Sequence, residues 1–495
     1  MMKINPNLTF YDAAYNWDID ESYHNNPFIL ALPPVLDQKD FQMMVTYRPE
    51  FHSSYREMST PDRCKKVCEV FDLVTPTKHF YDIYKILERM MFNAYVNRSS
   101  FEPKEVRRHY DIALHKAKID KRWKRTSGES FTLTADSGFG KTTMINRILD
   151  CFPQGFMHSE FKGQNFEQAQ ILWIKLKIPH DASRKSLADS FLCEVDKYLG
   201  TTFEADTKGG QVKDYMDAFK TIIETYKLGL LVIDELQNLS VARSGGDDIL
   251  LNFFSNLTDD IGVGLVLVGT PESTEFLSAT FTASRRLTSA GDRYLTRFEK
   301  NSTTWKLLVR SLWKYQFVNS PTKLFEVKDG KTEIVDEKLF DEIHDKTQGN
   351  LFVLNFLFVQ AQIMAMEKPH KETGRETLGI SAFRKAFNEG SQLIKAAIES
   401  IKSGDVNSYR DLLKTAQKVD SQEKVKLISE LKSLVQGKKL NNSSAKVVTK
   451  ILERLGGYAL TEHDELIIKN AKNLLKALKS QEKTQQSINQ KGAMK

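Results

Sequence analysis

The chain has 495 residues, of which 41% are hydrophobic and 27% charged, and it contains four cysteines. This length predicts about three domains, the composition excludes a wholly disordered chain, and so few cysteines exclude a disulfide scaffold. The net charge is +7, yet residues 401–495 hold 19 Lys and Arg against 10 Asp and Glu, a surplus of +9. The other 400 residues hold 52 Lys and Arg against 54 Asp and Glu. This basic end is expected either to bind DNA or an acidic partner, or to be a solvated helical surface.

Cys64 and Cys68 lie close together, but no second Cys or His pair stands at zinc-ligand spacing, so we expect four ordinary thiols. The N-terminus lacks the apolar region of a signal peptide, and no run of about 18 apolar residues occurs. We therefore expect neither a leader nor a membrane span, and a soluble, intracellular protein.

The first part of the chain, residues 1–60, is rich in aromatic residues, Asn and Pro and shows no helical period. The prolines of residues 27–34 are expected to disfavour regular structure there. A helix is predicted over 75–95 from the spacing of its large apolar residues. The basic stretch 104–125 that follows is expected to be either a DNA contact or a solvated helix.

From residue 130 onward, short apolar strands alternate with helical patterns, which predicts an α/β fold with a mostly parallel sheet flanked by helices. Strands are expected at 130–135, 171–178, 228–235 and 263–270, and helices at 141–151, 183–199, 214–227 and 248–261. After Trp305 the pattern becomes helical, with amphipathic helices expected at 335–365 and 380–402 and a polar insertion at 325–332. Residues 405–480 are expected to be helical and Lys-rich, and the residues after them disordered.

The clearest chemical motif is the octet ADSGFGKT at 135–142, a phosphate-binding loop pattern with Ala at its usual first Gly. Small residues let backbone N–H groups surround a phosphate, and the following helix directs its positive end toward the same anion. The Lys is expected to reach the β- and γ-phosphates, and the next residue to ligate Mg²⁺. The predicted nucleotide-binding residues are Ala135, Asp136, Ser137, Gly138, Phe139, Gly140, Lys141, Thr142, Thr143 and, from the next motif, Asp234.

The second motif is LLVIDE at 230–235, which places Asp234 and Glu235 at the carboxyl end of a buried strand. Ligands bind at that edge of open α/β sheets. We expect Asp234 and Thr142 to hold Mg²⁺, and Glu235 to orient or deprotonate the attacking water. The alternative for the hexamer alone is a strand that merely ends in acidic residues.

Two further motifs are expected to serve catalysis. Thr270 ends the next buried strand, where it could sense the γ-phosphate or cap the following helix. Arg285 and Arg286 stand near the end of the helix expected to begin at Pro271, and Arg can stabilise a transferring phosphoryl group from a neighbouring subunit. Arg293 and Arg297 compete for the same role, and an exposed Arg pair is otherwise ordinary surface.

Together these motifs resemble an AAA+ ATPase, which implies a P-loop NTPase fold with a helical lid and makes ATP and Mg²⁺ the expected cofactors. The resemblance suggests that the chain divides into four parts. They are an N-terminal partner-docking segment (1–75), a nucleotide-binding core (76–320), a helical lid (321–402) and a basic C-terminal extension (403–495). Many AAA+ proteins carry an Arg at the start of a late lid helix. Here that region reads Gly349-Asn350-Leu351, without an Arg.

Several segments are similar to the TnsC family, the ATP-dependent regulators of TnsA/TnsB/TnsC transposition systems. They are YHNNPFILALPP at 23–34, GLLVIDELQNLS at 229–240, RSGG at 243–246, LNFF at 251–254 and the stretch 261–271. The resemblance is specific over about 130–300, patchy over 20–60 and only architectural beyond 320. The basic extension suits the longer members of the family.

This resemblance implies an ATPase that assembles on double-stranded DNA as a homo-oligomeric ring or filament, in the cytoplasm of a bacterium and away from any membrane. It would link a target-selection protein of the TnsD or TniQ type to a TnsA/TnsB-like transposase, with ATP hydrolysis controlling disassembly. The N-terminal segment would face the target selector, and the basic extension would recruit the transposase. The residues expected to contact DNA phosphates follow the second strand of the core and are Lys177, Ser183, Arg184 and Lys185.

Two other functions remain open at this stage. One is an AAA+ replication initiator or helicase loader, which would usually carry the lid Arg and often a helix-turn-helix. The other is a nucleotide-switched scaffold that binds only proteins. DNA-stimulated ATP hydrolysis distinguishes the scaffold from the other two.

Overall fold

The computed structural model describes residues 10–101, 128–179, 183–238, 253–255, 257–273, 281–328, 330–390 and 392–403, with short helical pieces between 428 and 474. The chain divides into two compact units, Met1–Asp405 and Val406–Lys495. All the elements named below belong to the first unit. The domain boundaries expected at 75, 320 and 402 stay predictions.

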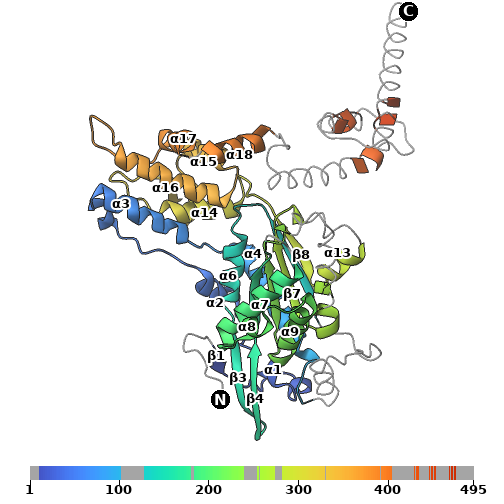
Figure 1. Cartoon of the computed structure of the whole chain (residues 1–495). Helices are drawn as coiled ribbons and strands as arrows, with labels where there is room; N and C mark the ends of the chain where they lie inside the picture. The colour runs from blue at the N-terminus through green and yellow to red at the C-terminus, as the bar shows by residue number, and fades with distance from the viewer. Residues whose placement is uncertain are drawn as a thin grey trace, which may run out of the picture. The chain divides into compact units, whose positions relative to one another are not determined.

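The centre of the first unit is a five-stranded parallel sheet (Figure 1). Its strands, in spatial order, are β5 (Trp173–Lys177), β6 (Leu230–Asp234), β7 (Gly264–Gly269), β2 (Ser130–Ala135) and β8 (Gly291–Leu295). The four strands predicted from the sequence are confirmed, and β8, with its exposed Asp292 and Arg293, was not predicted. The chain therefore has the AAA+ P-loop NTPase fold.

Both faces of the sheet are covered, which explains why β6 and β7 are almost wholly apolar. In β6, Leu230 and Val232 pack into one hydrophobic cluster, whereas Leu231 and Ile233 pack into the other. The helices on the first face are α4 (Lys78–Val96) and α6 (Lys141–Leu149), and those on the second are α7 (Arg184–Leu199) and α9 (Val212–Thr225). A short helix, α8 (Phe203–Thr207), connects the last two. Of the helix predicted at 248–261, the structure describes only 253–255 and the π-helix η4 (Leu257–Ile261).

The N-terminal segment contains more regular structure than its composition indicated. Its helices are η1 (Glu21–Tyr23), α1 (Pro27–Leu30), α2 (Gln38–Val45), η2 (Ser53–Glu57), α3 (Thr60–Lys66) and η3 (Val67–Asp72). The expectation that prolines prevent helix formation at 27–34 was wrong. Pro27 occupies the first helical turn, where its missing N–H costs nothing, and the Asn26 side chain caps the helix.

A second, three-stranded sheet was not predicted. It consists of β1 (Phe10–Asp12), β3 (Gly155–Phe161) and β4 (Gln164–Ile171) in the order β1-β3-β4. The strand expected at 171–178 is therefore the last residue of β4 followed by β5. The alternating polar residues of β3 and β4 hid this hairpin, because only one of its faces is buried.

The lid consists of helices grouped beside α14 (Thr303–Trp313) in Figure 1. They are α15 (Glu337–Thr347), α16 (Leu351–Glu367), α17 (Ile380–Glu389) and α18 (Gln392–Ser403), and the polar insertion is a hairpin of β9 (Phe325–Lys328) and β10 (Lys331–Ile334). The predicted helices 335–365 and 380–402 are each broken in two. The first break occurs where Gln348 and Gly349 adopt the left-handed conformation, with φ of 48° and 71°.

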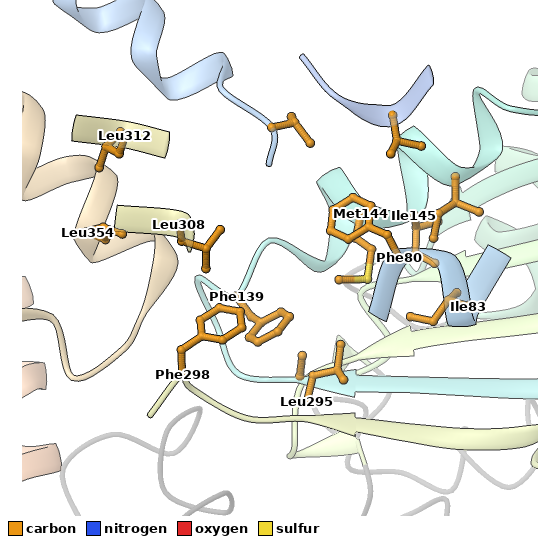
Figure 2. Close-up of a cluster of buried hydrophobic side chains, with 14 of the residues drawn as sticks. Phe80, Ile83, Phe139, Met144, Ile145, Leu295, Phe298, Leu308, Leu312 and Leu354 are labelled. Carbon is orange, nitrogen blue, oxygen red and sulfur yellow. The ribbon is translucent and has the colours of Figure 1, made fainter. Parts of the chain in front are cut away.

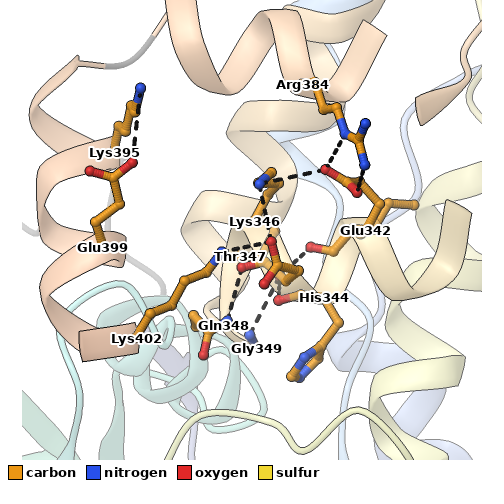
Figure 3. Close-up of polar contacts among 12 residues, drawn as sticks. Glu342, His344, Lys346, Thr347, Gln348, Gly349, Arg384, Lys395, Glu399 and Lys402 are labelled. Carbon is orange, nitrogen blue, oxygen red and sulfur yellow. Dashed lines mark hydrogen bonds and ion pairs between the residues drawn. The ribbon is translucent and has the colours of Figure 1, made fainter. Parts of the chain in front are cut away.

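Ion pairs join the lid helices to one another (Figure 3). Arg384 donates two hydrogen bonds to the Glu342 carboxylate, of 2.8 and 2.7 Å, and Lys402 lies 2.6 Å from Asp345. The Arg384 guanidinium lowers the pKa of Glu342.

Among the described residues, no single helix meets the length and hydropathy of a membrane span, and only the pair α15 and α16, bent by 120°, meets them jointly.

Candidate nucleotide-binding site

The predicted phosphate, metal and catalytic residues meet at one edge of the central sheet. Because all five strands run parallel, their carboxyl ends lie on the same side. Ala135 at the end of β2, Asp234 at the end of β6 and Thr270 just after β7 share this edge, and β7 lies between β6 and β2. Thr270 therefore lies between the phosphate loop and the acidic pair, and its role at the γ-phosphate stays a prediction.

The phosphate loop has the backbone that its glycines permit. Gly138 and Gly140 have φ of 77° and 92°, and Gly140 is the N-cap of α6. The Lys141 ammonium donates to the carbonyls of Ala135 and Asp136 at 2.8 and 3.1 Å, so it lies folded over the loop. Fixed N–H groups at a helix start, together with this cation, suit a phosphate chain.

The two predicted Mg²⁺ ligands contact each other. The Thr142 hydroxyl donates to Asp234 Oδ2 at 3.1 Å, and the Asp234 side chain is 2% exposed. Their oxygen atoms fit Mg²⁺, which binds proteins through one or two such ligands and takes others from phosphates and water. No group of three or more metal-ligating side chains occurs among the described residues, so the phosphates and water would complete the shell.

Lys175 of β5 also lies in this site, and the sequence motifs did not identify it. Its ammonium is 3.0 Å from Asp234 Oδ2 and donates to Asn146 Oδ1 at 2.7 Å. The cation compensates the buried Asp234 carboxylate when no metal is bound.

Glu235 stands on a sharp turn directly after β6, with φ of 59°, a left-handed conformation rare for this residue type. Gln237 donates through its side-chain amide to Glu235 Oε2. The Thr270 backbone N–H donates to Gln237 Oε1 at 3.2 Å, and the Thr270 hydroxyl is buried without a hydrogen-bond partner among the described residues. A buried hydroxyl in this position is suited to a phosphate oxygen.

Asp136 is the unusual acidic residue of the loop, and it is fully buried. Arg297, two residues beyond β8, places its guanidinium Nε 3.8 Å from Asp136 Oδ2. This pair offsets a negative charge next to the expected phosphates. Arg297 thus lies beside the loop of its own chain, which argues against its predicted role in a neighbouring subunit's site.

A cavity of about 240 Å³ opens beside the phosphate loop, and its lining is mostly apolar. The loop residues Gly138, Phe139 and Gly140 form one wall, and the N-terminal segment and helices α14 and α16 form the others. The Phe139 ring stacks on Phe298 with centroids 5.0 Å apart (Figure 2). An apolar cavity next to a phosphate loop is suited to a purine base.

Thr77 is a polar residue in this cavity wall that sequence reasoning missed. It is the N-cap of α4, yet its side chain makes no capping hydrogen bond. The hydroxyl is buried and has no partner among the described residues. An unsatisfied hydroxyl in a ligand cavity marks a position where a ligand atom can bind.

The N-terminal segment that forms this wall is also fixed to the lid. Arg63 of α3 donates to both carboxylate oxygens of Glu376, at 2.5 and 2.8 Å, and both side chains are 6% exposed. Arg63 also donates to the Phe317 carbonyl at 3.0 Å. The segment therefore contacts the core and the lid at once.

The lid reaches the phosphate loop through the start of α16. The Asn350 amide donates to the Ser137 carbonyl at 2.8 Å, and the Phe352 N–H donates to the Gly138 carbonyl at 2.9 Å. Asn350 could have been identified as a helix N-cap, since it directly precedes a long apolar helix. No pattern in the sequence predicts the contact of the Asn350 side chain with the phosphate loop.

Arg285 and Arg286 lie away from the phosphate loop of their own chain. They are exposed near the end of α13 (Phe281–Leu287), and Arg286 Nε is 3.7 Å from Asp259. The Leu287 carbonyl accepts from Thr132, and the residues that follow contact the start of β2. Their catalytic role stays a prediction.

The predicted DNA-contact residues differ in their surroundings. Lys177 and Arg184 are exposed. The Lys185 ammonium is engaged within the chain, 4.9 Å from the Tyr215 ring centroid and 3.2 Å from a backbone carbonyl. Ser183 caps α7 by accepting from the backbone of its first turn. The DNA role of all four stays a prediction.

Several predicted features lie outside the described residues. They are the basic stretch 104–125, the RSGG and LNFF segments apart from residues 253 and 254, the first turns of the helix expected at Pro271, and most of the basic extension.

Residues 124–277 match the family of AAA domains. The fold and the site thus have the features of an AAA+ P-loop NTPase, and this part of the chain is similar to an AAA domain. No match to a curated protein sequence was found.

Similar solved structures include a Walker-type ATPase of Pyrococcus abyssi, with TM-score 0.35, 13% identity and coverage of 76% of this chain and 91% of that one. Cdc6p from Pyrobaculum aerophilum has TM-score 0.35, 12% identity and coverage of 79% and 89%. PCH-2 of C. elegans has TM-score 0.31, 14% identity and coverage of 64% and 74%. Similarity at this level indicates neither a substrate nor a partner.

Proposed function

We propose that the chain is an ATP-dependent, DNA-binding regulator of transposition of the TnsC type. It assembles on double-stranded DNA and links a target-selection protein to the transposase, and ATP hydrolysis controls its disassembly. The observation that carries the ATPase part is the contact of Thr142 with Asp234 at 3.1 Å, directly beside the phosphate loop. The TnsC part rests on the sequence segments at 23–34 and 229–240.

In this proposal each side chain of the site has a distinct role. Lys141 binds the β- and γ-phosphates, Thr142 and Asp234 hold Mg²⁺, and Glu235 orients or deprotonates the attacking water. Bound Mg²⁺ neutralises charge that develops on the phosphates. The Thr270 hydroxyl contacts the γ-phosphate.

The position of Arg285 and Arg286 supports a site completed between subunits. Since they lie near the start of β2, whereas the phosphate loop follows its end, these two arginines would act on the transferring phosphoryl group of a neighbouring subunit. A ring or filament provides such a neighbour at every interface.

The test is DNA binding with ATP, with ADP and with a non-hydrolysable ATP analogue, imaged by electron microscopy. Rings or filaments on duplex DNA only with a triphosphate support the proposal, and dependence of insertion on this chain together with its transposase then separates it from a replication initiator or helicase loader. Nucleotide binding without assembly on DNA would instead identify a scaffold that binds only proteins.

A further inference from the structure

Gln237 connects two residues of the proposed ATPase site that come from different strands. Its side-chain amide donates to Glu235 Oε2, and its side-chain carbonyl accepts the Thr270 N–H at 3.2 Å. One side chain thus uses both of its polar ends, one on the residue expected to act on water and one on the residue expected to sense the γ-phosphate.

The backbone around Gln237 is held from both sides. The Leu236 N–H donates to the Val268 carbonyl of β7 at 3.0 Å, and the Asn238 side chain donates to the Ile178 carbonyl beyond β5 at 2.8 Å. Gln237 therefore stands on a short turn that is fixed to both neighbouring strands. Hydrogen bonds from such a fixed position can orient a side chain with little loss of entropy.

Glu235 needs such a partner because of its backbone. Its φ of 59° is a left-handed conformation that a residue with a Cβ rarely adopts. Its carboxylate is only partly buried. A partly exposed Glu has many rotamers, and the Gln237 amide selects one of them.

We infer that Gln237 is a positioning residue of the site, which holds the Glu235 carboxylate in register with Thr270 so that water and γ-phosphate are aligned. Gln237 touches neither the nucleotide nor the water. It acts through Glu235, and the inference rests on the proposed ATPase function.

The test compares ATP turnover and ATP affinity for Gln237→Met and Gln237→Glu. The first keeps the length without the amide, and the second replaces the donor by a carboxylate. We expect kcat to fall on the order of ten- to a hundredfold, with the Kd for ATP and the melting temperature close to wild type. Unchanged kcat in both variants would overturn the inference.

A double-mutant cycle separates positioning from a general structural role. In a Glu235→Gln background, single-turnover hydrolysis should be no slower after Gln237→Met is added, because the group that Gln237 orients is already lost. An equal slowing in both backgrounds would show a structural role and overturn the inference. Absence of hydrolysis by the wild type would instead sink the proposed function itself, and this inference with it.

Discussion

The side-chain amide of Asn350 donates a hydrogen bond to the backbone carbonyl of Ser137 across 2.8 Å, joining the lid to the phosphate loop. The Asn350 side-chain oxygen Oδ1 also caps α16, because it accepts a hydrogen bond from the Val353 backbone N–H at 3.1 Å. The fit is close, since a Cβ added to Gly138 would lie 2.7 Å from this side chain. Where related lids are expected to offer an arginine, this lid contacts the loop backbone.

The Asn350 contact predicts that Asn350→Asp weakens nucleotide binding. Aspartate still caps the helix but cannot donate to Ser137, so the loop is held less firmly and affinity should fall roughly three- to tenfold. Titration with a fluorescent ATP analogue measures this. Asn350→Ser is the uncharged control, which caps the helix but is too short to reach the loop, and wild-type affinity in both variants would refute the coupling.

Thr77 predicts effects of opposite sign on stability and on binding. Thr77→Val keeps the shape and removes the unpaired hydroxyl, so the nucleotide-free chain should be unchanged or more stable, by about 1 kcal/mol. If the hydroxyl contacts the base, nucleotide affinity should fall severalfold. Calorimetry and nucleotide titration measure the two, and Thr77→Ser, which retains the hydroxyl, should bind normally. Unaltered affinity in the valine variant would exclude Thr77 from base recognition.

Lys141 and Glu235 should separate binding from hydrolysis. Lys141→Ala removes the cation expected on the phosphates and should abolish ATP binding, whereas Glu235→Gln should bind ATP and persist on DNA because hydrolysis is slowed severely. Equilibrium dialysis with ATP and lifetimes on DNA give the two readouts. Normal ATP affinity in Lys141→Ala would show that residues 135–142 have been assigned incorrectly.

If Arg285 and Arg286 act on a neighbouring subunit's nucleotide, two inactive variants should restore part of each other's activity when they are mixed. A chain with both Arg285→Ala and Arg286→Ala should bind ATP without hydrolysing it, since its own loop is intact. Mixed with Glu235→Gln, it should regain part of the activity, because some interfaces then pair an intact loop with an intact arginine. ATPase assays of each protein and of the mixture test this, and full activity in the arginine variant alone would rule the pair out.

His158 predicts a loss of stability in mild acid. It is 2% exposed and its Nε2 lies 3.0 Å from Gln170 Oε1, and burial lowers its pKa to about 4. Since the unfolded chain has a histidine pKa of about 6.5 and binds the proton first, stability should fall by about 2 kcal/mol from about pH 7 to about pH 5 through this residue.

Urea unfolding at the two pH values measures the His158 contribution. His158→Gln should remove that part of the pH dependence, whereas the exposed control His370→Gln should retain it. Identical pH dependence in wild type and His158→Gln would show that His158 does not titrate with unfolding.

The sequence by itself determined the parts of the molecule that depend on local pattern. The apolar runs before Asp234 and before Thr270 predicted two strands of the central sheet, because strands buried on both faces are rich in apolar residues. The stretch SFTLTA at 130–135, rich in β-branched and aromatic residues, predicted a third. The loop at 135–142 and the acidic pair at 234–235 were predicted from residue type and spacing, since small residues, a lysine and carboxylates are what a phosphate and its Mg²⁺ require.

Only the tertiary structure decided which distant residues complete the site. Thr77, Lys175, Gln237, Arg297 and Asn350 come from five separate segments, and the sequence motifs predicted none of the contacts that they make in the site. Their positions follow from strand order and from how the N-terminal segment and the lid pack on the core. Long-range packing of this kind has no period or spacing in the sequence, so their roles appear only when the chain is folded.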